Sequence, residues 1–247
     1  MNILLIGAGN MGGAILAGMD RSHVTVVEAY APRAEELRGL YPEITVVESI
    51  PSLDGYVVIL AVKPQSLASI RFNGRARALI SILAGTTLAK LRETIEAEAY
   101  IRAMPNLAAL HGKAVTSVTG DEVFKDEAMM ILGSIGQTIW LPNETQLDIA
   151  TGLAGSAPAW LAMVAEALAD GAVDLGLPRA TAMAYLPMLF EGVGALLADE
   201  HPALLKDKIA SPGGTTIAGV GALERHGVRD GFIDAMRAAY VRAQEIG

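Results

Sequence analysis

The sequence predicts an α/β domain with a doubly wound parallel sheet, followed by an all-α domain. A glycine-rich turn joins an apolar run to a helical pattern at the start of the chain. Short apolar runs then alternate with helical patterns through the first half, as in parallel sheets whose strands are joined by helices. Beyond residue 143 we find no convincing strand pattern. We therefore expect a dinucleotide-binding sheet domain over residues 1–143 and a helical domain over residues 144–247.

The first strand and the turn after it carry the main functional signal. Residues 2–6 form a short apolar run typical of a buried strand, and Gly7, Gly9 and Gly12 then give G-x-G-x-x-G. Gly7 permits a tight turn, Gly9 lets a pyrophosphate approach the backbone, and Gly12 lets the helix pack closely on the strand. The free N–H groups and the positive dipole end of that helix face the anion. The motif therefore predicts dinucleotide binding of the Rossmann type, rather than a glycine-rich turn in an ordinary α/β domain.

The second predicted strand, residues 23–29, bears on the choice of dinucleotide. It leads to Glu28, where the acidic side chain of a Rossmann domain bonds the adenosine ribose hydroxyls. Glu28 favours NAD, because its charge repels a 2′-phosphate. Arg33 lies in a predicted helix over residues 32–40 and could pair with such a phosphate, or it could be a solvated helix residue. These two signals conflict, so the sequence predicts a cofactor that is either NADPH or NADH.

Further strands and helices complete the predicted sheet domain. Strands are expected at residues 44–48, 56–62, 78–83, 100–104, 114–118 and 137–141, and helices at residues 86–97 and 121–135. The carboxyl ends of these strands carry candidate site residues, because such folds bind ligands at that edge. Lys63 follows one strand and is either a cofactor ligand or a solvent-exposed lysine. Asn106 follows another and either bonds the nicotinamide carboxamide or caps a turn.

The second half is predicted to be helical, with helices over residues 145–175, 178–197, 202–209 and 232–245. The first of these is loosened by Gly152, Gly155 and Pro158. An apolar stripe at helical spacing on the same helix is interpreted as core packing, and it consists of Leu161, Val164, Ala165 and Leu168. A short helical domain this apolar often needs a partner subunit to cover it, which predicts an oligomer.

The stretch SPGGTT, residues 211–216, is not interpreted as core. Two glycines flanked by hydroxyls and leading into a helix form a nest of N–H donors suited to a carboxylate. The hydroxyls of Thr215 and Thr216 can donate or accept hydrogen bonds. The alternative interpretation is a plain helix start with a Ser or Thr cap.

The composition excludes several classes of function. The net charge of −8 argues against nucleic acid and anionic membranes as partners, since both require a basic face. The chain has no cysteine, which excludes disulfides, thiol catalysis and cysteine metal sites, and no metal is expected. The uncharged run over residues 149–165 is short for a membrane span. With no signal-peptide pattern at the start, we expect a cytoplasmic protein, whose high mean hydropathy of +0.39 reflects apolar surface buried in an oligomer.

Several blocks of the chain, in order, resemble the pyrroline-5-carboxylate reductase family, the last enzymes of proline biosynthesis. The blocks are IGAGNMGGAI (6–15), ILAVKPQ (59–65), RAMPN (102–106), LAGSAPA (153–159), EALADGAVDLGLPR (166–179) and SPGGTTIAG (211–219). The combination of SPGGTT with AVKP is far more specific than the glycine motif alone. The chain departs from the usual LSGSGPA at Ala154 and Ala157, and Glu28 is less typical of members that prefer NADPH.

The resemblance implies a reaction and a set of roles. Hydride would pass from C4 of the nicotinamide to the imine carbon of 1-pyrroline-5-carboxylate, giving L-proline. The imine nitrogen can arrive already protonated, so no strong acid is needed, and the four histidines are interpreted as structural or exposed. Holding the two reacting carbons in contact would supply up to about 7–11 kcal/mol.

The same resemblance assigns residues to these roles. Thr216 would bond the ring nitrogen, and Ser211 with the backbone of Gly213, Gly214 and Thr215 would hold the carboxylate. The cofactor would lie along Gly7, Gly9, Asn10, Met11, Gly12, Ala61, Val62, Lys63, Pro64 and Ala84. Glu28 and Asn106 join this set by their positions at the carboxyl ends of predicted strands. The helical domain would form an interlocked homodimer, in larger rings of dimers in some members, with the substrate loop of one subunit facing the cofactor of the other.

Two other functions fit parts of the pattern. A reductase of the β-hydroxyacid dehydrogenase type also joins a Rossmann domain to helices, but its catalytic lysine lies in a context that neither Lys206 nor Lys208 provides. A cofactor-sensing regulatory protein without turnover would share the glycine motif. Such a sensor has no use for the SPGGTT loop.

Overall fold

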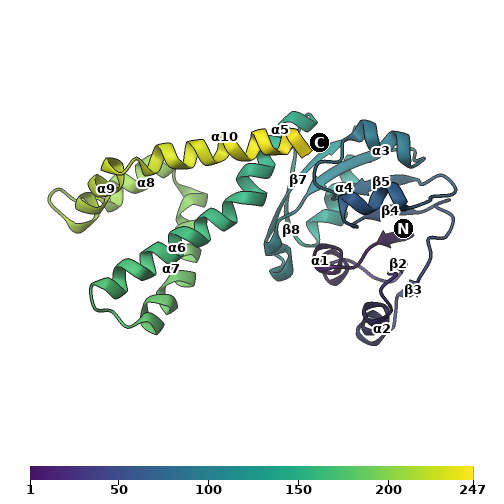
Figure 1. The fold of residues 1–247 in the computed structure, drawn as a ribbon, viewed down its shortest axis with the longest axis horizontal. Helices are drawn as coiled ribbons and strands as arrows, with labels where there is room; N and C mark the ends of the chain where they lie inside the picture. Colours follow the sequence, from purple (N-terminus) through teal and green to yellow (C-terminus); the bar gives the residue numbers. More distant parts are fainter. Residues whose placement is uncertain (247) are drawn as a thin grey trace. The chain divides into compact units, whose positions relative to one another are not determined.

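The computed structural model describes residues 1–246 (Figure 1). Its contacts divide the chain into two compact units. The sheet unit comprises residues 1–156 together with the end of the chain from Ala238, and the helical unit is Ala157–Arg237. This division differs from the predicted boundary after residue 143, because the next helical turns and the last turns of the chain pack with the sheet. Each unit is described separately.

The sheet unit contains one eight-stranded sheet of order β3-β2-β1-β4-β5-β6-β7-β8. The strands are β1 (Ile3–Ile6), β2 (Val24–Val27), β3 (Thr45–Val47), β4 (Val57–Leu60), β5 (Ala78–Ser81), β6 (Tyr100–Met104), β7 (Ala114–Gly120) and β8 (Gly136–Trp140). The strand order reverses between β1 and β4, and doubly wound sheets bind ligands at that point. All predicted strands are present within a residue or two of their expected places, so the α/β fold class is confirmed.

One pair of strands departs from the predicted parallel sheet. β6 and β7 are antiparallel, whereas the other neighbouring pairs are parallel. Only the short 3-10 helix η2 (Leu107–His111) connects β6 to β7. A parallel crossover needs a dozen or more residues, so a connection this short can only turn the chain back.

Helices cover both faces of the sheet. They are α1 (Asn10–Gly18), α2 (Ala31–Leu40), η1 (Pro64–Ser69), α3 (Leu88–Thr94), η3 (Glu122–Phe124) and α4 (Lys125–Gly133). Successive residues of β1 enter different cores: Ile3 and Leu5 pack with α1, α2 and α4, whereas Leu4 and Ile6 pack with η1 and α3. The sheet unit is therefore filled on both sides by its own side chains.

The predicted long helix after the sheet is loosened where its glycines and proline lie. It consists of α5 (Glu144–Ala150), a π-helical turn η4 (Thr151–Ser156) and α6 (Ala157–Asp174). The π turn contains Gly152 and Gly155. A π turn inside a helix commonly marks a functional position.

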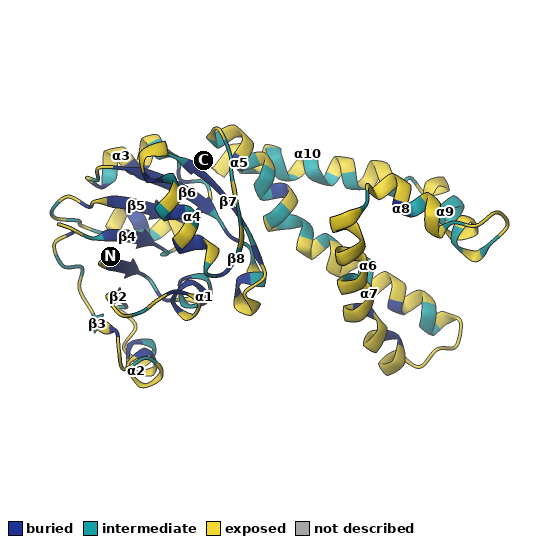
Figure 2. Ribbon diagram, turned by 180° about the vertical axis from the view of Figure 1, so that it is seen from behind, coloured by how far each residue is buried: buried dark blue, intermediate teal, exposed yellow. Residues whose placement is uncertain are grey.

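The helical unit contains α6, then α7 (Arg179–Asp199), α8 (Pro202–Ile209), α9 (Thr215–Arg225) and α10 (Val228–Ile246), and the last of these continues into the sheet unit. Its buried apolar cluster consists of Ala169, Ala182 and Leu186. The predicted core stripe on α6 is only partly buried in the single chain. Ala165 packs against this cluster, whereas Leu161 is 47% and Leu168 is 49% exposed. Much of both α6 and α7 is exposed in Figure 2.

Two helical segments are long and apolar enough to cross a membrane by length and composition, Glu144–Asp174 and Arg179–Asp199. The sequence analysis judged only the uncharged run over residues 149–165, which is shorter than either of these two helical segments.

Candidate active site

The glycine turn after β1 has the geometry that the motif predicts. Gly7 has a φ of +92°, and a Cβ there would lie 2.9 Å from the carbonyl oxygen of Ala61. A Cβ on Gly12 would lie 2.1 Å from the carbonyl oxygen of Gly7, so the helix packs directly on the turn. Around Gly9, by contrast, no atom beyond the glycine and its two chain neighbours lies within 4 Å of the Cβ position. The open space at Gly9, at the start of α1, is where an anionic ligand would approach the helix N–H groups.

A pocket of about 660 Å³ opens beside this turn. Its polar wall includes Glu28, which follows β2 and accepts hydrogen bonds at 3.1 Å from the backbone N–H of Ala8 and at 3.0 Å from that of Tyr30. The side chain of Tyr30 is 67% exposed and also lines the pocket, a role that the sequence analysis missed. Its position two residues after Glu28 could have indicated that it lines the same pocket.

Arg33 reaches the same pocket from α2. Its Nε donates to the carbonyl oxygen of Ala8 at 3.0 Å, and its NH1 pairs with Glu36 at 2.7 Å. The side chain is 29% exposed. Arg33 is therefore held against the glycine turn and is more than a solvated helix residue.

The ends of β4 and β5 supply a second concave surface. A pocket of about 840 Å³ is lined there by Pro64, Ala84, Thr86 and Lys90 among others. Ala61 and Val62 lie against Gly7, so the structure brings the AVKP segment to the glycine turn as predicted. Lys63 is exposed and precedes η1. Thr86, which is buried, is a lining residue that the sequence analysis did not single out.

The structure gives the side chain of Asn106 backbone partners. Its Nδ2 donates to the carbonyl oxygen of Ala154 in the π turn at 2.9 Å, and its Oδ1 accepts from Val115 N–H at 3.3 Å. It makes no side-chain cap for η2, the turn that it precedes. One amide hydrogen remains for a ligand, because an NH₂ group carries two. Asn106 thus links the end of β6 to the helix that leaves the sheet.

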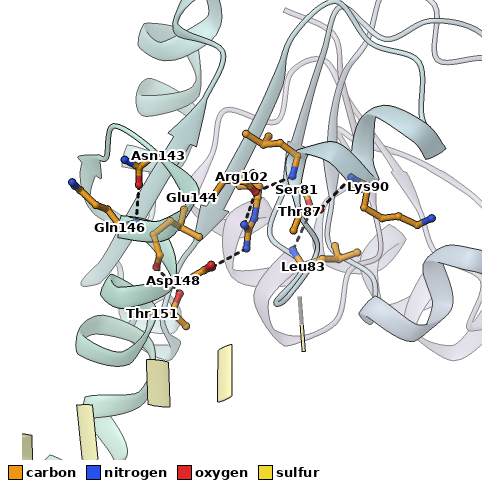
Figure 3. Close-up of polar contacts among 12 residues, drawn as sticks. Ser81, Leu83, Thr87, Lys90, Arg102, Asn143, Glu144, Gln146, Asp148 and Thr151 are labelled. Carbon is orange, nitrogen blue, oxygen red and sulfur yellow. Dashed lines mark hydrogen bonds and ion pairs between the residues drawn. The ribbon is translucent and has the colours of Figure 1, made fainter. Parts of the chain in front are cut away.

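A buried arginine fixes α5 to the sheet (Figure 3). Arg102 on β6 is 3% exposed and pairs with Glu144 at 2.5 Å and with Asp148 at 3.3 Å. Glu144 also accepts from Leu88 N–H at 2.8 Å, and Asp148 accepts from Gln244 of α10 at 3.2 Å. Burial raises the pKa of Asp148, and the charge of Arg102 offsets part of that rise. The sequence analysis missed this cluster, because it placed Arg102 on a strand and in the RAMPN block without assigning it a partner.

The SPGGTT stretch lies in the helical unit and opens α9. Gly213 has a φ of +70°, and the N–H of Gly214 donates to the carbonyl oxygen of Ser211 at 3.0 Å. Gly214 is the N-cap residue of α9, and no side chain caps the helix there. The alternative of a Ser or Thr side-chain cap is therefore wrong. Thr215 is exposed and Thr216 half-buried on the first turn, beside uncapped N–H groups that can receive a carboxylate.

Among residues 1–246, no group of three or more His, Asp or Glu side chains is placed to hold a metal ion. The reaction expected at this site is a hydride transfer to a carbon–nitrogen double bond, and the residues that the sequence predicts for it provide hydroxyls and backbone N–H groups. These groups suit binding and orientation.

Known proteins resemble this chain over its whole length. Residues 144–246 match a family profile described as pyrroline-5-carboxylate reductase dimerisation, and residues 2–85 match one described as NADP oxidoreductase coenzyme F420-dependent. The pyrroline-5-carboxylate reductase of a Synechocystis strain is 38% identical, over 98% of this chain and 97% of its own. That of a Thermus thermophilus strain is 35% identical, over 100% and 99%.

The chain belongs to the pyrroline-5-carboxylate reductase family. The solved structure of a pyrroline-5-carboxylate reductase from Coxiella burnetii superposes with a TM-score of 0.87 at 27% identity, covering 100% of this chain and 98% of its own. The predicted family, and with it a nicotinamide-dependent oxidoreductase, is confirmed.

The two residues that depart from the usual family sequence LSGSGPA lie where the π turn meets α6. Ala154 lies in the π turn and Ala157 is the first residue of α6. Asn106 bonds the backbone oxygen of Ala154, so this contact does not depend on the side chain at that position. The family match begins at residue 144, the predicted start of the helical domain, whereas α5 packs with the sheet.

Proposed function

We propose that this chain reduces 1-pyrroline-5-carboxylate to L-proline with NADPH or NADH. The observation that carries the proposal is the uncapped start of α9 within SPGGTT, in a chain that belongs to the pyrroline-5-carboxylate reductase family. A protein that only sensed a dinucleotide would need the glycine turn but would not need this second anion-binding helix start.

The bound nicotinamide supplies a hydride to the imine carbon when it is in place. The chain's own groups would hold the two reactants. The turn from Gly7 to Gly12 would hold the pyrophosphate at the start of α1, and Ser211 with the N–H groups of residues 213–215 would hold the substrate carboxylate. The Thr216 hydroxyl oxygen would accept a hydrogen bond from the ring nitrogen, which arrives protonated, so that hydride addition to the iminium carbon gives the secondary amine directly. Catalysis then rests mainly on orientation.

The active unit is proposed to be a homodimer, with larger rings of dimers as a further assembly. Leu161 and Leu168 on α6 and Leu189 on α7 are about half exposed in the single chain. A second copy that covers these helices would remove this apolar surface from water. The same dimer accounts for the two apolar helical segments without a bilayer, so we propose a cytoplasmic protein that does not span a membrane.

The test is an assay of the purified chain with 1-pyrroline-5-carboxylate, following loss of the near-ultraviolet absorbance of the reduced cofactor and appearance of proline. Turnover that requires the imine supports the proposal. Tight cofactor binding without turnover, with either cofactor, would contradict it and would favour a cofactor-sensing protein.

A further inference from the structure

We infer that the dinucleotide pocket of this chain selects NADH over NADPH, and that Glu28 is the residue that decides. The inference rests on the proposed function for the identity of the ligand class, and it names which member of that class the pocket accepts. In the sequence, Glu28 favours NADH and Arg33 could favour NADPH. The hydrogen bonds that each side chain makes in the structure decide between them.

The Glu28 carboxylate is fixed by the backbone on two sides of the pocket. One oxygen accepts from Ala8 N–H in the glycine turn, and the other accepts from Tyr30 N–H before α2. Moving the carboxylate aside for a phosphate would break both hydrogen bonds. A carboxylate has about four lone-pair positions, so each oxygen can still accept a hydrogen bond from a ribose hydroxyl.

Arg33 is oriented to hold the glycine turn. Two of its three guanidinium nitrogens are already bonded, Nε to the Ala8 carbonyl and NH1 to Glu36. The third, NH2, lies 2.8 Å from the position of a Cβ on Gly13, so it packs against α1. An arginine frequently binds a phosphate through two parallel donors, and Arg33 has already committed its Nε to the Ala8 carbonyl and its NH1 to Glu36.

The charges that line this pocket sum to a negative value. Glu28 and Glu36 are acidic and Arg33 is basic, and the other lining residues are uncharged. A 2′-phosphate carries about −1.5 to −2 charges near neutral pH. It would meet the fixed Glu28 carboxylate in the position where a ribose hydroxyl would meet a hydrogen-bond acceptor. Repulsion between the phosphate and this carboxylate is expected to disfavour NADPH by at least ~10-fold.

The experiment is a calorimetric titration of the whole protein with NADH and, separately, with NADPH, without imine. We expect NADH to bind at least ~10-fold more tightly. Glu28→Ser should shift the ratio of the two dissociation constants toward NADPH. Glu36→Gln, which keeps both backbone hydrogen bonds of Glu28, should shift the ratio the same way by a smaller factor.

Glu35→Gln is the matched control, because Glu35 lies on the same helix, pairs with Arg38 and does not line the pocket. It should leave the ratio unchanged. The inference is overturned if NADPH binds the unaltered chain as tightly as NADH, or if neither Glu28→Ser nor Glu36→Gln moves the ratio more than Glu35→Gln does. Since binding is measured without turnover, failure of the reductase assay would not by itself change this outcome.

Discussion

The two units use apolar residues in opposite ways. In the sheet unit, residues such as Leu5, Ile59 and Ile80 have no exposed surface, and helices from the same chain cover both faces. In the helical unit, the buried apolar cluster has three members, while Met188 on α7 is 64% and Leu189 is 48% exposed. The first unit folds on itself, and the second presents a surface that we assign to a second copy of the chain. Apolar composition alone therefore does not show whether a helix is filled from within or from a partner.

The sharpest way to break this comparison is to place charge on the helical unit. Leu161→Glu combined with Leu189→Glu should convert a dimer into a species with the mass of one chain, 25.8 kDa, and abolish reductase activity. Each leucine that a partner buries contributes about 1.5–3 kcal/mol, and a buried unpaired carboxylate adds a further cost. Light scattering after size-exclusion chromatography measures the mass.

The control for that pair is Val123→Glu on η3 of the sheet unit, where the side chain is 81% exposed. This variant should keep the mass and the activity of the unaltered chain. If the double variant kept the dimer mass, another surface would hold the subunits together, and the assignment of this face would be lost.

The next effect concerns chemistry in the helical unit. Thr216→Ala should lower turnover by roughly 10- to 1,000-fold, as expected for loss of one positioned hydrogen bond in the transition state. Thr216→Ser keeps the hydroxyl and should recover most of the activity. Steady-state kinetics at saturating cofactor make the comparison, and unchanged turnover in Thr216→Ala would remove this residue from the site.

A buried ion pair of the sheet unit should contribute more to stability than an exposed ion pair of the helical unit. Arg102→Met leaves Glu144 and Asp148 unpaired in the sheet unit and should lower the free energy of unfolding by about 3–5 kcal/mol. The matched change in the helical unit, Arg179→Met, breaks an exposed pair with Asp170 and should cost about 0–1 kcal/mol. Urea unfolding at one protein concentration measures both, and equal losses would contradict the contrast.

The smallest expected effect is a pH dependence from Asp148. Because burial raises its folded pKa above the ordinary value of 3.8, the native chain retains a proton there that the unfolded chain has released. The stability that this group contributes is complete below pH 3.8 and declines as the pH rises through the folded pKa. Asp148→Asn removes this decline.

The measurement is urea unfolding at a series of pH values rising from 3.8. The variant should gain stability relative to the unaltered chain as the pH increases through this window. Parallel curves would show that the carboxyl has the same pKa in both states.

Local pattern was enough to predict most of the sheet unit. The β1 run, the three glycines and the helix after them form one continuous segment, so the role of each glycine could be predicted from residues close to it in the sequence. The reversal at β7 was missed because the wrong direction was inferred from alternation, although the short connection after β6 was visible. The helical spacing of Leu161 and Leu168 correctly predicted a helix. Such spacing identifies an apolar face of the helix and does not say what covers that face.

In the candidate site, too, the features within one segment could be predicted from the sequence, and the contacts between distant segments could not. Gly7, Gly9 and Gly12 were assigned from spacing, and the structure shows the turn, the open space and the close packing that their roles require. The bonds that hold Glu28 and the cluster around Arg102 join residues far apart in the sequence, so no local pattern encodes them. Nor could spacing show that Asn106 is bonded to the π turn.

The account depends most on a site completed by two subunits, and mixed dimers test it directly. Gly9→Val would fill the open space of the glycine turn in one chain, and Thr216→Ala would disable the loop in the other. Two tags would allow the mixed dimer to be purified after co-expression. If the loop of one subunit faces the cofactor of its partner, the mixed dimer holds one intact site and should be far more active than either parent homodimer. A mixed dimer no more active than the mean of the two parents would contradict the account.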